Sequence, residues 1–447
     1  MSELPPQKRA GTRLNRWRLA LCAVLVGAGL SACLPSIFND DDDYDADNDA
    51  EFVVRYMKDW YLWEDRLPND INEADYSSGQ AALDALKVAE DRYSGITPAA
   101  EYNRFFRDGQ TVGFGLSYRI EEGDQAIRVV LVQPQAPAQE AGLRRGDLIT
   151  EVEGEAVSTL IAEDRLNAAF GPLDEGVTRS FAITRDGNTL SLTIVKALYN
   201  LSYVIADAMF EAGGRKVGYV NFFSFAEKGV APWQSALDRL LEEGAQDLIV
   251  DLRSNGGGLL SVTQRVGSSL GANSLRGKVL AELTFNNRRD ENNRTYKFGI
   301  DSRSGQFERL VWLTSRSSCS ASEALIVGLD PHRTATRVGE TTCGKPVGFT
   351  PPTFGDNVYS IVTFRLRNAV GTTDYFDGLT PDCPVADDGA GQLGDRNEAL
   401  TAAALAFLET GNCPAQGAQA IKALRDTRSL GEMTNHPTGL PALTNLW

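Results

Sequence analysis

The stretch LIVDLRSNGGG, residues 248–258, decides the fold. A mostly apolar segment leads into polar residues and three consecutive glycines, which is typical of a buried strand that ends in a turn. A helix is expected to start at about Leu260. Further out, the pattern predicts strands at residues 217–222 and 310–313 and a helix at 232–243. Strands that alternate with helices in this way predict an α/β core built on βαβ units.

Two different patterns precede this core. Apolar residues at helical spacing in residues 52–63 and 81–89 predict helices whose aromatic side chains belong to a core. From residue 112 to about residue 195, short strands such as residues 127–132 and 190–194 are separated by turn residues. The second pattern predicts a separate small β domain.

The first residues have the pattern of an export signal. Five lysine and arginine residues in the first 18 positions precede the apolar run LALCAVLVGAGL, residues 19–30, which is too short to span a bilayer as a stable helix. The sequence Leu30-Ser31-Ala32-Cys33 resembles a bacterial lipobox, which implies cleavage before Cys33 and a lipid on its sulfur. The alternative is an ordinary signal peptide. The residue after Cys33 is Leu34 and not Asp, which resembles lipoproteins that Gram-negative bacteria sort to the outer membrane.

Composition and charge exclude several classes of protein. A chain that is 42% hydrophobic and 23% charged is typical of a globular protein and not of a disordered or collagen-like one. The net charge of −16 argues against a nucleic-acid partner, because phosphate binding needs clustered lysine and arginine. The acidic run at residues 39–49 predicts an extended tether. The alternative, a calcium loop, lacks the glycine and the final glutamate of an EF-hand.

The six cysteines divide into two groups. Cys22 lies in the apolar run that would be removed, and Cys33 would carry the lipid. Four cysteines remain in a compartment that permits disulfides, namely Cys319, Cys343, Cys383 and Cys413. Four cysteines can pair in three ways. Their spacing matches no zinc pattern, and the chain has two histidines, so a metal site is not expected. The overall interpretation of the sequence implies no organic cofactor either.

The glycine turn at residues 256–258 is the first candidate for chemistry. Glycines let backbone N–H groups point into a cleft without obstruction by a Cβ atom, so the turn could bind an oxyanion or a phosphate. The patterns GxxxxGK[ST] and GxGxxG of nucleotide-binding loops are both missing. A bare glycine turn can also be purely structural.

Of two further segments, one carries a candidate serine and the other a candidate lysine. The first is SSCSASEAL, residues 317–325, in which a serine at a helix N-terminus is either an N-cap or a nucleophile favoured by the helix dipole. The second is GETTCGKPVG, residues 339–348, where glycine, proline and apolar residues flank Lys345. A desolvated lysine loses its charge and can deprotonate a serine, whereas the alternative is a solvated surface lysine.

These motifs in this order closely resemble the carboxyl-terminal (tail-specific) processing peptidases of serine peptidase family S41, over roughly residues 50–410. The motif SASE at residues 320–323, with Lys345 at 25 positions after Ser320, carries the resemblance together with the glycine turn and the preceding β domain. The resemblance implies a ClpP/crotonase-like core of ββα units, with Ser320 as nucleophile and Lys345 as general base. It also implies backbone oxyanion donors at Gly256 or Gly257 and at Ala321.

The sequence departs from this family at two positions. Cys319 replaces an alanine, and Phe349 stands where many members carry a glutamine that orients the lysine. Either Glu323 or Gln264 holds Lys345, or the Ser/Lys dyad works without a third member. A Ser/His/Asp triad would need His332, which we expect at the surface, or His436.

The small β domain resembles a PDZ domain. The carboxylate loop corresponds to Gly113-Phe114-Gly115-Leu116, and PAQEAGLRRGDLI, residues 137–149, is similar to a second PDZ segment. PDZ domains bind the C-termini of other proteins by adding a strand to a sheet edge. The resemblance implies that this loop delivers protein tails to Ser320; the alternative is a PDZ fold that only gates or packs on the site.

The resemblance also bears on the disulfides. If Ser320 and Lys345 are neighbours, Cys319 and Cys343 are neighbours too, which predicts a disulfide between them and a second between Cys383 and Cys413. The rival interpretation is that the cysteines are buried thiols. Asp382, in a segment similar to the G-x-x-PD motif of the family, is expected to be structural.

The chain is therefore identified as a member of this peptidase family, with an α/β catalytic core, an inserted PDZ β domain and an N-terminal helical segment. The expected parts are a lipoprotein signal peptide (1–32), an acidic tether (33–50), a helical domain (51–110), a PDZ domain (111–200), a peptidase core (201–413) and a tail (414–447). The resemblance implies a lipid-anchored serine endopeptidase at the periplasmic face of the outer membrane. It would act on proteins bound by their C-termini, with or without an activator protein. The alternative is an inactive PDZ-containing scaffold lipoprotein.

Overall fold

The computed structural model describes residue 44 and residues 46–121 and 123–414. The predicted signal segment with Cys33, most of the acidic tether, His436 and nearly all of the expected tail lie outside the described residues. Within the described part of the sequence, no helix is long and apolar enough to cross a membrane.

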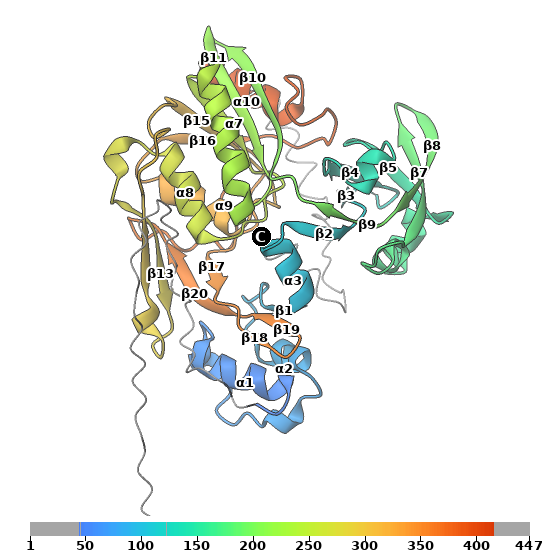
Figure 1. The fold of residues 1–447 in the computed structure, drawn as a ribbon, viewed down its shortest axis with the longest axis vertical. Coiled ribbons are helices and arrows are strands. Elements are labelled where there is room, and N and C mark those ends of the chain that lie inside the picture. Colours follow the sequence, from blue (N-terminus) through green and yellow to red (C-terminus); the bar gives the residue numbers. More distant parts are fainter. Residues whose placement is uncertain (1–43, 45, 122, 415–447) are drawn as a thin grey trace, which may run out of the picture. The chain divides into compact units, whose positions relative to one another are not determined.

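A six-stranded sheet forms the centre of the α/β core (Figure 1), with the strand order β10-β11-β12-β15-β16-β21. Its strands are β10 (Val204–Ala212), β11 (Arg215–Phe222), β12 (Asp247–Asp251), β15 (Arg309–Thr314), β16 (Ala335–Gly339) and β21 (Cys383–Pro384). The first two strands form an antiparallel hairpin, and all later pairs are parallel. Every residue of β12 is buried, as expected for a parallel strand covered on both faces. The strands predicted around residues 217–222, 248–252 and 310–313 are all present.

Helices cover both faces of this sheet. On one face lie α7 (Val230–Glu242), α8 (Leu260–Leu270) and α9 (Ala321–Leu329), which pack on alternate strand residues that include Val250 and Trp312. On the other face, α10 (Ala399–Thr410) packs on the intervening residues that include Ile249 and Val311. Because neighbouring strand residues point to opposite faces, each inner strand contributes to two hydrophobic cores.

The N-terminal segment packs on two smaller antiparallel sheets. These are β14-β13-β20-β17 and β1-β19-β18. Their strands are β13 (Val279–Phe285), β14 (Arg294–Lys297), β17 (Val347–Phe349), β18 (Thr353–Phe354), β19 (Asn357–Ser360), β20 (Val362–Arg367) and β1 (Gly95–Pro98). The helices α1 (Asp49–Trp60) and α2 (Gly79–Leu86) share a hydrophobic core with β13 and β20. The segment expected to be helical therefore also supplies β1, which pairs with β19.

The inserted β domain follows α3 (Ala99–Phe106). A two-stranded ribbon of β2 (Gln110–Gly113) and β9 (Ala197–Asn200) begins and ends it. Its main sheet has the order β3-β4-β5-β7-β8, with the short β6 (Glu155–Ala156) paired to β5. These strands are β3 (Leu116–Ile120), β4 (Ile127–Val132), β5 (Leu148–Val152), β7 (Thr178–Arg185) and β8 (Asn188–Val195), and the helices are α4 (Pro137–Glu140), α5 (Val157–Ala162) and α6 (Leu166–Phe170). The strand predicted at residues 127–132 is β4.

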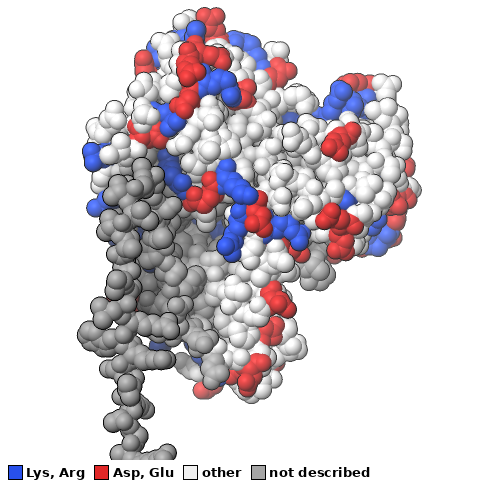
Figure 2. All heavy atoms as spheres, in the orientation of Figure 1, with Lys and Arg blue, Asp and Glu red and all other residues white. Residues whose placement is uncertain are grey.

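Charged side chains of both signs are interspersed on the face of the molecule shown in Figure 2. The described residues include several partly exposed ion pairs, for example Arg303 with Asp238. A mixed surface of this kind gives that face no field of a single sign.

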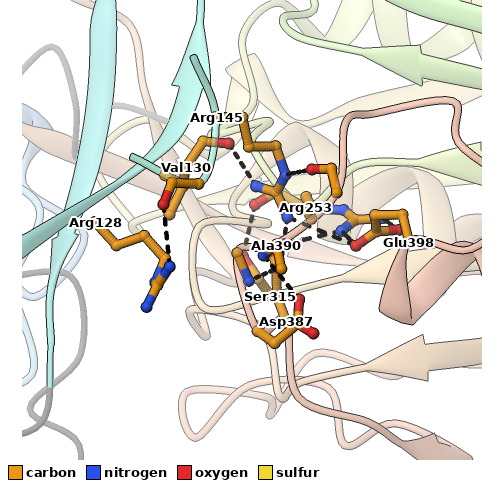
Figure 3. Close-up of polar contacts among 12 residues, drawn as sticks. Arg128, Val130, Arg145, Arg253, Ser315, Asp387, Ala390 and Glu398 are labelled. Atoms are coloured by element: carbon orange, nitrogen blue, oxygen red, sulfur yellow. Dashed lines mark hydrogen bonds and ion pairs between the residues drawn. The ribbon is translucent and has the colours of Figure 1, made fainter. Parts of the chain in front are cut away.

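A buried arginine joins the β domain to the α/β core (Figure 3). The side chain of Arg145 is 3% exposed and donates to Asp387 Oδ1, and its Nε donates to the carbonyl oxygen of Gly391 at 3.2 Å. Arg145 also lies 3.6 Å from a carboxylate oxygen of Glu398, at the start of α10. A charge buried this deeply is stable only when opposite charges and hydrogen bonds surround it.

A second buried arginine continues the network into the core (Figure 3). Arg253 follows β12 and contacts Asp251 through Nε at 2.9 Å, Asp387 through Nη1 at 3.4 Å and Glu398 through Nη2 at 2.9 Å. Burial by itself would raise the pKa of Asp387, but Arg253 and Arg145 together hold that pKa well below its usual range. Asp387 is therefore a charged link between the two domains.

Replacement of Asp387 with Asn should destabilise the protein strongly. The substitution leaves two buried guanidinium groups without one of their carboxylates, which we expect to lower the free energy of unfolding by about 3–5 kcal/mol. Urea denaturation of the variant and the parent measures this. The control is Asp388→Asn at the exposed neighbouring position, which should change the free energy by less than about 0.5 kcal/mol. Equal stability of the two variants would contradict the prediction.

The difference between the parent and Asp387→Asn should also depend on pH. Because the folded-state pKa of Asp387 is depressed, its contribution is present above the ordinary aspartate pKa of about 4 and is lost as the pH falls through the folded value. The gap in unfolding free energy should therefore be full at neutral pH and shrink on acidification below about pH 4. A gap that stays constant down to the acid transition would show that the charge of Asp387 contributes nothing.

Candidate active site

Ser320 lies between β15 and the first residue of α9. Its backbone has a conformation that residues other than glycine rarely adopt. Its φ is 54° and its ψ is −110°. The N–H of Ser320 donates to Glu323 Oε2 at 3.0 Å, and its carbonyl oxygen accepts from the N–H of Ala324 at 2.7 Å. Backbone strain of this kind persists only where the surrounding structure imposes it, and it clusters at active sites. Ser320 is the N-cap of α9 and forms a capping box with Glu323, as the N-cap alternative expected, but N-capping alone does not explain the strain.

The glycine turn lies directly against this serine. Gly257 has a φ of +115°, and a Cβ atom there would come within 2.9 Å of the carbonyl oxygen of Cys319 and 3.0 Å of the Ser320 Cβ atom. The carbonyl oxygen of Asn255 holds the same segment, because it accepts from the N–H of Cys319 and from Ser322 Oγ at 2.8 Å. Only glycine at position 257 allows so close an approach.

The N–H groups of the turn are not equivalent. The N–H of Gly257 donates to Asn255 Oδ1 at 2.8 Å, which removes it as an oxyanion donor in this conformation. Among the described residues, no acceptor is hydrogen-bonded to the N–H of Gly256 or of Ala321. Of the two alternatives from the sequence, Gly256 is thus the better candidate donor, and Ala321 lies at the N-terminus of α9.

Glu323 connects the serine segment to the lysine segment. Its side chain is fully buried, and its Oε2 accepts from the N–H groups of both Ser320 and Lys345, at 3.0 and 2.8 Å. Its Oε1 accepts from the N–H of Gly344 at 2.8 Å and from the Thr342 hydroxyl. Burial raises the pKa of Glu323, and these hydrogen bonds act in the opposite direction. One carboxylate therefore orders both candidate catalytic segments.

Gln264 was the other candidate for holding Lys345, and the structure shows this to be wrong. Its Nε2 donates to the carbonyl oxygen of Lys297 in β14 at 2.6 Å. His332 contacts the carbonyl oxygen of Val279 through Nε2 at 2.9 Å and packs edge-on against Phe298. It is half-buried and not a fully exposed surface residue.

Lys345 is fully buried just before β17, as predicted for a desolvated lysine, so the alternative of a solvated surface lysine is wrong. Burial lowers its pKa to about 7, although the nearby charges of Asp91 and Glu323 act in the opposite direction. Its Nζ lies over the Phe349 ring at 4.1 Å from the centroid and 5.4 Å from the centroid of Tyr93. At neutral pH a substantial fraction of this amine is uncharged.

The two disulfides join the expected pairs of cysteines. The Cα atoms of Cys319 and Cys343 are 5.2 Å apart, and those of Cys383 and Cys413 are 5.3 Å apart. The first disulfide joins the residue before Ser320 to the loop that carries Lys345, and the N–H of Cys343 also donates to the carbonyl oxygen of Ser318 at 3.1 Å. Cys319, Cys343 and Glu323 are close enough for a metal site, but the disulfide uses both sulfur atoms.

The loop from Gly113 to Leu116 connects the ribbon to the edge strand β3. The carbonyl oxygens of Phe114 and Gly115 accept from Ala138 and Gln133, each at 2.8 Å, and the buried Phe114 ring packs edge-on against Phe181. Since β3 is the end of its sheet among the described strands, one side of it is open to a further strand. This is the geometry that strand addition needs.

Sequence reasoning missed the contribution of the N-terminal segment to the site. Tyr93 and Asp91 lie in the loop before β1, and the Tyr93 hydroxyl donates to the carbonyl oxygen of Gly344, next to Lys345. Asp91 is buried and accepts from Tyr61 and Ser94. Neither residue belongs to a pattern with a chemical meaning in the sequence, so no signal could have found them.

Three family profiles match the chain. Residues 216–385 match Peptidase family S41, residues 50–95 match the Peptidase S41 N-terminal domain, and residues 112–195 match a PDZ domain. A carboxyl-terminal-processing protease of Synechocystis sp. is 29% identical over 237 residues, 53% of this chain and 53% of that protein. The chloroplastic C-terminal processing peptidase of Tetradesmus obliquus is 30% identical over 291 residues, 61% of this chain and 60% of that protein. The matches span less than two thirds of the length of these relatives.

One solved structure gives a clear likeness of fold. A crystal structure from Bacteroides fragilis, provisionally described as an S41 protease, superposes with a TM-score of 0.67 at 21% identity. The superposition covers 81% of this chain and 97% of that chain. The expected fold, an α/β peptidase core with an inserted PDZ domain and an N-terminal helical segment, is thereby confirmed.

Gly257→Ala should disrupt the contact between the glycine turn and Ser320. The new Cβ atom meets backbone atoms of Cys319 and Ala321 and must displace them, which we expect to cost about 1–3 kcal/mol of unfolding free energy. The matched control is Gly277→Ala, where φ is also positive at +78° but no atom lies within 4 Å of the added Cβ atom. Urea denaturation compares the two, and equal losses would show that the contact at Gly257 is not tight.

Proposed function

We propose that this protein, which carries a peptidase family S41 domain beside a PDZ domain, is a serine endopeptidase that uses a Ser320/Lys345 dyad. The observation that carries the proposal is the state of Lys345. It is fully buried, its pKa is lowered to about 7, and Glu323 ties its backbone to that of Ser320. A lysine with this pKa can act as a general base near neutral pH.

The mechanism begins with transfer of the Ser320 hydroxyl proton to the uncharged Lys345 amine. Ser320 Oγ attacks the peptide carbonyl, and the N–H groups of Gly256 and Ala321 stabilise the oxyanion together with the N-terminus of α9. The Lys345 ammonium then returns its proton to the leaving amine, which leaves an acyl group on Ser320. Water, deprotonated by Lys345, then attacks the acyl carbon, the bond to Ser320 Oγ breaks, and the Lys345 ammonium returns the proton to Ser320 Oγ.

The substrates we propose are proteins recognised by their C-termini. The N–H groups of the loop Gly113-Phe114-Gly115-Leu116 would bind the terminal carboxylate, and the tail would pair with the open side of β3. The buried Arg145 connects this domain to Arg253, which precedes the glycine turn. An activator protein would be a further partner.

We further propose a lipid anchor on Cys33 that holds the enzyme at the periplasmic face of the outer membrane. The support is the basic and apolar signal segment with its lipobox-like end, and Leu34 after the cysteine. Two disulfides fit an oxidising compartment such as the periplasm.

Ser320→Ala and Lys345→Ala should each abolish proteolysis. We expect losses of at least about 10³-fold in kcat/KM, because neither residue of such a dyad functions without the other. The assay is mass spectrometry of the cleavage products of an unfolded protein with an apolar C-terminus, using the full-length protein in detergent. The matched controls are Ser317→Ala and Lys58→Ala, which should retain activity.

Two outcomes would contradict the proposal. Cleavage that survives in Ser320→Ala would place the nucleophile elsewhere. A parent protein that binds the tail but never cleaves it would support the scaffold alternative.

The acid limb of the pH profile should report Lys345. Below its pKa of about 7 the amine is an ammonium that cannot accept the serine proton, so kcat/KM should fall about tenfold for each pH unit below 7. The measurement is kcat/KM for a fluorogenic peptide between pH 5 and 9. A limb centred near pH 4, the range of ordinary carboxyl groups, would show that another group limits the reaction.

A further inference from the structure

Two aromatic rings from distant segments enclose the Lys345 amine. Phe349 belongs to β17, and its ring centroid lies 4.1 Å from Nζ. Tyr93 belongs to the loop before β1, and its ring centroid lies 5.4 Å from the same atom. The lysine is fully buried, and Tyr93 is 7% exposed. The amine therefore lies in a buried enclosure to which the N-terminal segment contributes one side.

Hydrogen bonds fix the position of the Tyr93 ring. Its hydroxyl donates to the carbonyl oxygen of Gly344, and its N–H donates to Asp91 Oδ1 at 3.1 Å. Asp91 in turn accepts from the N–H of Ser94 at 2.9 Å and from the Tyr61 hydroxyl at 2.9 Å. The ring is thus anchored both to its own loop and to the residue before Lys345.

The faces of aromatic rings act on a lysine in two ways. They attract the ammonium through the ring quadrupole, and they exclude the water that would otherwise solvate it. A ring is a weaker hydrogen-bond acceptor than a side-chain amide oxygen. It therefore orients the amine but favours the charged form less than an amide oxygen would.

We propose that Phe349 and Tyr93 are positioning residues that hold the Lys345 amine by their ring faces. The inference rests on the proposed function in taking Lys345 as the base, but the test below measures the amine itself and does not need proteolysis.

Charged and titratable groups from several elements face this enclosure. Asp91 and Glu323 favour the charged amine, and burial disfavours it. Arg92 lies over the Tyr93 ring at 5.4 Å from its centroid. Burial raises the pKa of Tyr93 and of the nearby Tyr375, so both hydroxyls are neutral around pH 7. Titration of Lys345 near pH 7 is therefore not confused with titration of either tyrosine.

The test measures the titration midpoint of Lys345 by NMR of full-length protein that contains lysine labelled with ¹³C at Cε. The resonance is assigned by its loss in Lys345→Met. The key variants are Phe349→Leu, which removes the ring but stays apolar, and Phe349→Gln, which introduces an amide acceptor. Tyr93→Leu and Tyr93→Phe separate the ring of the tyrosine from its hydroxyl.

The two Phe349 variants should move the midpoint in opposite directions. Phe349→Leu removes the attraction for the ammonium and should lower the midpoint by about 0.5–1 pH unit. Phe349→Gln offers a hydrogen-bond acceptor to the ammonium and should raise it by about the same amount. Tyr93→Leu should lower the midpoint, and Tyr93→Phe, which keeps the ring, should retain the parent value.

The matched control is Phe364→Leu. Phe364 lies on β20, which pairs with β17, and packs against Phe285, so the substitution removes the same atoms from the same sheet. It should lower the melting temperature and leave the Lys345 midpoint unchanged. A midpoint that is the same in the parent and both Phe349 variants, or that shifts equally in Phe364→Leu, would overturn the proposal. The expected shifts in a protein that cleaves nothing would uphold it and instead refute the proposed function.

Discussion

The buried carboxylate of Glu323 is the interaction on which the candidate active site depends. It accepts hydrogen bonds from the backbone of Ser320 on one side and from Gly344 and Lys345 on the other. A carboxylate without water must satisfy its oxygen atoms with protein donors, so its burial forces the two segments together. The Cys319–Cys343 disulfide adds a covalent link between the same segments. The strained backbone of Ser320 is stable because Glu323 holds its N–H group and the disulfide holds the preceding residue.

The site is an assembly of three parts of the protein. The α/β core supplies Ser320, Lys345 and the glycine turn, and the N-terminal segment supplies Tyr93 and Asp91 around the lysine. The PDZ domain reaches the core through Arg145, whose partners Asp387 and Glu398 also bind Arg253. Buried charges bind tightly only to correctly placed partners, so these contacts define how each part meets the core.

Regular patterns in the sequence translated directly into structure. The strand predicted at residues 127–132 is β4, and the strands at 217–222 and 310–313 are within one to two residues of β11 and β15. The cysteine pairs agree with what the family resemblance implied, whereas the cysteines alone left three pairings open. The sequence could not decide whether Glu323 or Gln264 holds Lys345, because that depends on side chains that converge from different elements. Nor could the sequence show that the N–H of Gly257 is already bound by Asn255.

By itself the sequence determined the class of fold, the order of the domains and the residue types that could perform catalysis, because local periodicity and motif spacing are written along the chain. Only the tertiary structure decided which groups surround the lysine and shift its pKa to about 7. Desolvation depends on everything packed around an atom, and here the packing comes from residues as far apart as Tyr93 and Phe349. The lowered pKa of Lys345 is therefore a property of the folded protein and not of any segment within it.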